Sequence, residues 1–96
     1  MPYVHISRVP GRGIADFRAI QEEVARHDAP GQIATVAGEA DGELHIVDVW
    51  ESKAHADRYA AEQLFPAFQR SGRGPRTDAT YITFDTDEIV LKGGTR

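Results

Sequence analysis

The chain has 96 residues, no cysteine and a formal net charge of −4, with 41% hydrophobic and 27% charged residues. This profile is typical of one folded domain, excludes disulfides and thiolate chemistry, and argues against a nucleic-acid partner, whose phosphates need a basic surface. The first residues lack the apolar stretch of a secretion signal, and no apolar run approaches the roughly 18 residues that span a membrane. We therefore expect a cytoplasmic protein without a membrane partner.

The first third of the sequence predicts a strand, a helix and a second strand. Residues 3–9 are rich in β-formers and are followed by a Pro and two Gly that end the strand. Residues 32–39 have the same character. Between them, residues 14–27 predict an amphipathic helix, because apolar side chains recur at spacings of three and four: these are Ile14, Phe17, Ile20 and Val24.

A hairpin and a second helix follow. The Ala-Asp-Gly sequence at 40–42 predicts a tight turn, since Asp-Gly supplies the positive φ angles that such a turn needs. Residues 43–50 then form the third strand. Ser52 suits the N-cap of a helix over residues 53–65. That helix should break or restart near Pro66, because Pro66 lacks a backbone donor.

The last part of the sequence predicts a turn and loop over residues 67–75, a fourth strand within residues 79–91 and a frayed tail at 92–96. The order β-α-β-β-α-β is typical of an α+β fold with a ferredoxin-like antiparallel sheet. We predict one domain over 1–96, with an ordered core at about 3–91.

The strand at 43–50 is apolar on both faces. Val47 and Val49 point one way, and Leu44, Ile46, Asp48 and Trp50 the other. Two helices cover only one face of such a sheet, so a second copy packed sheet against sheet is the simplest cover for the other. The alternative is a ligand-binding groove without a dimer.

The valines have few polar neighbours on their own face, so we assign that face to the helices, together with Val4, Ile6, Ile82 and Phe84. Asp48 would then face away from the helices, into a cavity closed by the second copy. The predicted lining of that cavity is Tyr3, His5, Ser7, Thr35, Asp48, Trp50 and Tyr81.

A carboxylate beside an imidazole can carry out acid–base chemistry in such a cavity. His5 and Asp48 belong to the two central strands of a ferredoxin-like sheet, so they should be near enough to share a proton. Trp50 and Tyr81 offer flat surfaces and a hydroxyl for an aromatic ligand. The alternative is that Asp48 only accepts structural hydrogen bonds. No metal site is expected, because the histidines do not cluster with carboxylates at ligand spacing.

The order of elements, the turn at 40–42, the Val-Asp-Val-Trp-Glu-Ser segment at 47–52 and the break at 64–66 resemble the dimeric α+β barrel proteins. More narrowly, residues 3–91 are similar to small antibiotic biosynthesis monooxygenase-like proteins, many of them uncharacterised actinobacterial proteins. This resemblance implies a homodimer formed through the non-helical sheet face. It also implies oxygenation of a small aromatic or quinol-type substrate by O₂ without a cofactor.

The resemblance suggests roles for the residues already singled out. Asp48 or His5 would be the base, Tyr81 a phenolate partner and Trp50 a stacking wall, with Tyr3, Ser7 and Thr35 completing the substrate site. The haem-degrading branch of the superfamily uses a late helix histidine, which residues 65–70 lack. A non-catalytic dimeric module that binds a small hydrophobic molecule and a cofactor-free isomerase or cyclase remain alternatives.

Overall fold

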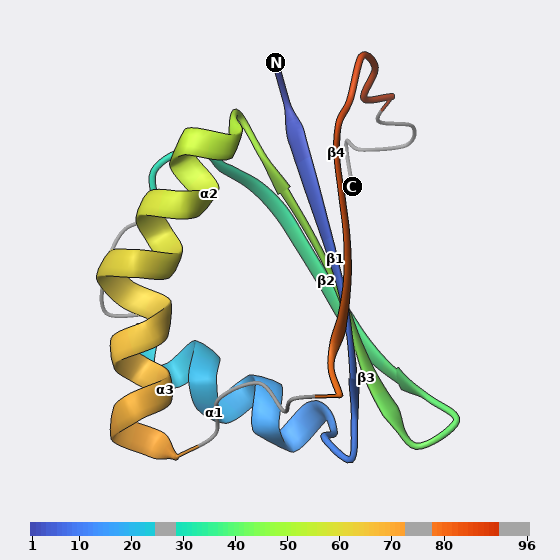
Figure 1. The fold of residues 1–96 in the computed structure, drawn as a ribbon, viewed down its shortest axis with the longest axis vertical. Coiled ribbons are helices and arrows are strands. Elements are labelled where there is room, and N and C mark those ends of the chain that lie inside the picture. The colour runs from blue at the N-terminus through green and yellow to red at the C-terminus, as the bar shows by residue number, and fades with distance from the viewer. Residues whose placement is uncertain (25–28, 73–77, 91–96) are drawn as a thin grey trace, which may run out of the picture.

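A computed structural model describes residues 1–24, 29–72 and 78–90. Four strands and a layer of helices follow the predicted order, which confirms the ferredoxin-like α+β arrangement (Figure 1). The elements are β1 (Tyr3–Pro10), α1 (Ile14–Val24), β2 (Gln32–Ala40), β3 (Glu43–Trp50), α2 (Lys53–Tyr59), η1 (Ala60–Leu64), α3 (Phe65–Ser71) and β4 (Thr80–Asp85).

The four strands form one antiparallel sheet in the order β2-β3-β1-β4. The helices all lie on one side of this sheet, and within the described ranges no helix lies on the other side (Figure 1). The two central strands are β1 and β3, so the residues in the middle of these strands lie beneath the helical layer. This arrangement leaves one protected face and one open face.

Helix α1 begins where the sequence predicts. The side chain of Asp16 accepts a hydrogen bond of 2.9 Å from the backbone N–H of Gly13, which satisfies one of the free donors at the helix start. Ile20 and Val24 from the predicted apolar stripe are buried. Residues 25–27, the end of the predicted helix, lie outside the described residues.

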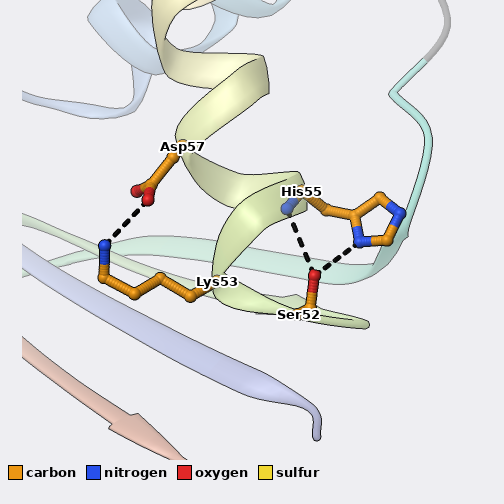
Figure 2. A network of polar contacts seen from close by, with 4 residues as sticks. All are labelled: Ser52, Lys53, His55 and Asp57. Atoms are coloured by element: carbon orange, nitrogen blue, oxygen red, sulfur yellow. Dashed lines mark hydrogen bonds and ion pairs between the residues drawn. The ribbon is translucent and has the colours of Figure 1, made fainter.

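The second helix starts at Ser52, as predicted, because the Ser52 hydroxyl accepts a hydrogen bond from the backbone N–H of His55 (Figure 2). The same hydroxyl lies 2.7 Å from Nδ1 of His55. On the exposed side of this first turn, Nζ of Lys53 pairs with Asp57 at 2.7 Å, one helical turn further on. These contacts fix where the helix leaves the end of β3.

A new helical segment starts at Phe65, which is the restart expected near Pro66, but the turn predicted at residues 67–70 is wrong because α3 covers them. A π-helical turn, η1, connects α2 to α3, and the backbone N–H of Phe65 bonds to the carbonyl of Ala60. Pro66 then occupies the first turn of α3, where a missing N–H costs nothing. The helix ends at Gly72, whose φ of 69° is the left-handed conformation of a helix C-terminus.

The predicted hairpin is confirmed. Asp41 and Gly42 have φ angles of 53° and 74°, as a tight two-residue turn requires. The fourth strand ends earlier than the range in which it was predicted. After Asp85, the hydroxyl of Thr86 donates to the carbonyl of Glu88 at 2.9 Å, a local turn that replaces the strand pairing. Residues 73–77 of the predicted loop and the tail at 92–96 lie outside the described residues.

The assignment of the two sheet faces from the valines is wrong. Trp50, Leu44 and Ser7 have exposed fractions of only 3%, 4% and 7%, and their strand face lies under the helices. By alternation, the opposite face is open, and it carries Val4, Ile6, Val47, Val49, Ile82 and Phe84. The reason for the error is that both faces of β3 are apolar, so alternation separates the two faces without showing which one the helices cover.

Candidate active site

A cavity of about 500 Å³ lies between the helices and the sheet face that carries Leu44, Asp48 and Trp50. Its volume is within the range of about 300–1,000 Å³ that small-molecule pockets have. Most of the lining is apolar or aromatic, with few polar groups. The sheet and the turn after β1 contribute His5, Ser7, Val9, Arg12, Gln32, Leu44, Ile46, Asp48, Trp50 and Tyr81, and the helices contribute Asp16, Phe17, Ile20, Gln21, Ala56, Tyr59, Ala60, Leu64, Phe65 and Phe68.

Asp48 is the carboxylate on the sheet floor of this cavity. It lies opposite His5 in the β1–β3 pairing, and its Oδ1 accepts a hydrogen bond of 2.8 Å from the Thr35 hydroxyl. Burial raises the pKa of Asp48 above its usual range, while the Thr35 hydrogen bond and the nearby His5 act in the opposite direction. The net increase brings this carboxylate closer to the proton affinity that a general base needs near neutral pH.

Thr35 is itself held by a second side chain. Nε2 of Gln32 donates a hydrogen bond of 2.8 Å to the Thr35 hydroxyl oxygen, so Gln32, Thr35 and Asp48 form a continuous polar chain. Gln32 lines the cavity, whereas Thr35 lies beside the carboxylate without lining it. Thr35 therefore contacts Asp48 and not the cavity itself.

The indole of Trp50 packs against the phenol of Tyr59, with 5.1 Å between ring centroids and an interplanar angle of 47°. Burial raises the pKa of the Tyr59 hydroxyl, and the charge of Asp48 raises it further. Tyr59 was not among the predicted site residues. Nothing in the sequence places its phenol near Asp48, because that approach depends on how the helix crosses the sheet.

A second ring pair lies on the β4 side. His5 and Tyr81 have ring centroids 5.3 Å apart, and the Ser7 hydroxyl shares a hydrogen bond of 3.3 Å with Nδ1 of His5. Tyr81 is 50% exposed because β4 is an edge strand, so its ring belongs to the rim of the cavity. The imidazole therefore lies between a buried hydroxyl and a rim phenol.

The structure brings five of the seven predicted site residues to one cavity: His5, Ser7, Asp48, Trp50 and Tyr81. They lie beneath the helices, not on the far face where the cavity was expected. Tyr3 is buried on the same strand face but does not line the cavity. Phe65 and Phe68 also line the cavity but had no predicted role: Phe65 was expected to end a helix, and Phe68 to lie in a turn.

Within residues 1–24, 29–72 and 78–90, no three His, Cys, Asp or Glu side chains gather as metal ligands would. In the same part of the chain, none of the helices has the length and apolar character needed to cross a membrane.

Comparison with solved structures shows what this arrangement resembles. The structure of Rv0793 from Mycobacterium tuberculosis aligns with a TM-score of 0.72 over 95% of this chain and 100% of that chain, at 13% identity. SnoaB, a cofactor-independent oxygenase from Streptomyces nogalater, aligns with a TM-score of 0.68 over 93% and 96%, at 16% identity. A protein described as an antibiotic biosynthesis monooxygenase aligns with a TM-score of 0.64 over 90% and 98%, at 19% identity.

The chain has the fold of the antibiotic biosynthesis monooxygenases. The likeness is one of fold, and it agrees with the ferredoxin-like α+β arrangement that the sequence predicts. No family model matches the sequence, and neither does any curated protein. A shared monooxygenase fold does not by itself define a reaction, so the activity must be argued from the residues of the cavity.

Proposed function

We propose that the protein is a cofactor-independent monooxygenase-like enzyme that acts on a small aromatic or quinol-type metabolite. The observation that carries this proposal is the desolvated carboxylate of Asp48, opposite His5, on the floor of an aromatic-lined cavity. The structural likeness to a cofactor-independent oxygenase supports the same reading.

In the proposed reaction, the carboxylate of Asp48 accepts a proton from an electron-rich phenolic substrate, and the His5 imidazole opposite it is the alternative base. The resulting anion reacts with O₂, which takes up four electrons from the substrate over the whole reaction. A CH₂ group would become a carbonyl, with one oxygen atom retained in the product and the other leaving as water. The protein contributes proton removal, orientation and exclusion of bulk water.

The two ring pairs would hold the substrate over the carboxylate. Trp50 offers a stacking surface, and the Tyr81 hydroxyl at the rim can donate to a substrate oxygen. Ser7 would fix the imidazole of His5 through its hydrogen bond. In this proposal, Thr35 acts through Asp48, and Tyr3 supports the floor.

Oxygen uptake with a panel of anthrones and naphthols tests the proposal. We expect Asp48→Asn to slow uptake by about 10²-fold or more, because loss of a general base typically has an effect of this size. The matched control is Asp57→Asn on the exposed side of α2, which should keep the parent rate. Equal uptake by the parent and Asp48→Asn would remove Asp48 from the mechanism.

The open face of the sheet supports a homodimer. Val36, Ile82 and Phe84 have exposed fractions of 64%, 62% and 46%, which is costly for apolar side chains on one sheet face. We infer that a second copy covers this face, sheet against sheet, as the fold of the superfamily implies. In such a dimer the cavities stay inside each subunit, between its own sheet and helices.

The Asp48–His5 pair also favours a second candidate, a cofactor-free isomerase or cyclase, because moving a proton does not require O₂. Product analysis under anaerobic conditions separates the two, since only an oxygenase should stall. A non-catalytic binding module would show a thermal shift with the same ligands and no product in either atmosphere.

A further inference from the structure

Strand β2 contains an extra residue beside the cavity. Gln32 pairs with Trp50 and Ala34 with Val49, so Ile33 has no partner on β3 and forms a β-bulge. In a regular strand, residues three apart point to opposite faces.

The bulge instead brings Gln32 and Thr35 to the same face, towards the cavity. Their burial supports this, because both side chains are half-buried while Ile33, Ala34 and Val36 are exposed.

We propose that Gln32 and Thr35 are positioning residues that hold the carboxylate of Asp48 in one orientation toward the cavity. The inference deepens the proposed function, since the role of Asp48 as a base rests on that function. The polar chain is observed directly as two hydrogen bonds of 2.8 Å, and it does not depend on the proposed function.

The direction of the hydrogen bonds supports this assignment. The amide nitrogen of Gln32 can only donate, so the Thr35 oxygen accepts there and must direct its single hydrogen to Oδ1 of Asp48. Among the described residues, Oδ2 has no protein partner at hydrogen-bond distance. The chain therefore engages one carboxylate oxygen and leaves the other to meet a substrate hydroxyl.

The test is the titration of Asp48 in the ligand-free protein, followed by ¹³C NMR of its carboxyl carbon and assigned with Asp48→Asn. The Thr35 hydroxyl stabilises the charged carboxylate, so Thr35→Val should raise the pKa of Asp48 further. Thr35→Ser keeps the hydroxyl and should restore the parent titration. Thr80→Val, on the exposed start of β4, is the matched control and should leave it unchanged.

Gln32→Leu provides an independent variant that leaves Thr35 in place. Without the amide donor the Thr35 hydrogen is free to rotate, so we expect a smaller shift of the Asp48 pKa in the same direction. An unchanged or lowered pKa in both Thr35→Val and Gln32→Leu would overturn the proposal.

The titration needs no substrate, so it separates this inference from the proposed function. If Thr35→Val raises the pKa and the parent consumes no O₂ with any substrate, the positioning role stands and the oxygenase function fails. If the parent is active, the pH profile of kcat/KM should shift to higher pH in Thr35→Val and return to the parent position in Thr35→Ser.

Discussion

His5 and Asp48 lie directly opposite one another in the antiparallel pairing of β1 and β3. The pairing follows from topology, because these strands are the central neighbours of the sheet. It places an imidazole beside a carboxylate that burial has made harder to ionise. The consequences of that burial can be measured without knowing the substrate.

The first prediction concerns stability and pH. Asp48 has a pKa raised above 3.8 by burial, so the native state holds its proton at pH values where the unfolded chain has lost it. The contribution of Asp48 to the free energy of unfolding is therefore fully present below its ordinary pKa in the unfolded chain. It is lost as the pH rises through the higher pKa of the folded state. Chemical denaturation of the parent and Asp48→Asn should show the variant gaining relative stability with pH. A difference that stays constant across this window would contradict the prediction.

The second prediction concerns Tyr59, whose pKa is raised above 10.0 by burial and, to a smaller degree, by Asp48. Ultraviolet titration, with Tyr59→Phe subtracted, isolates this phenol from the other tyrosines. In Asp48→Asn the pKa of Tyr59 should fall but stay above the ordinary value, because burial remains. No change between the two backgrounds would show that the phenol does not sense the carboxylate.

The third prediction concerns assembly. Sedimentation should show a dimer for the parent, and Ile82→Lys or Phe84→Lys should weaken it at least tenfold. The reason is that burying a large apolar side chain is worth about 1.5–3 kcal/mol and every 1.4 kcal/mol is roughly tenfold in Kd. Phe65→Lys, which changes a side chain that is 53% exposed on the helical layer, should stay dimeric. A parent that remains monomeric at high concentration would refute the sheet-to-sheet dimer.

The fourth prediction concerns the hairpin between β2 and β3. Gly42 has a φ of 74°, so Gly42→Ala should destabilise the fold by about 1 kcal/mol. Gly38 is the matched control, because a Cβ added there meets nothing within 4 Å and its φ is not in the left-handed range. Thermal unfolding of Gly42→Ala and Gly38→Ala should therefore differ, and equal midpoints would contradict this account.

The sequence predicts the order of elements, the turn at Asp41 and Gly42 and the proximity of His5 to Asp48, because each depends on local pattern or on a common topology. It does not predict which sheet face the helices cover. Both faces of β3 are apolar, so alternation separates them without saying which is which. Only the structure shows that Trp50 lies on the covered face, where it lines the same cavity as Ala56 and Ala60 of the helices.

Two local irregularities of the structure could not be predicted from the sequence. The bulge at Ile33 is a single extra residue in a β-rich stretch, and nothing in the composition of that stretch marks it. The continuation of the helix past Pro66 depends on the wide turn before it, which has no simple sequence signal. Both features determine which side chains reach the cavity.

The wide turn at Ala60–Leu64 has a geometric consequence for the mouth of the cavity. A π turn holds one residue more than an α turn, and each residue of a helix advances the azimuth by about 100°. Inserted into a regular α-helix, one more residue would therefore rotate Phe65 and Phe68 away from the cavity that they line. The wider turn absorbs that residue locally, so both rings keep their side of the helix axis.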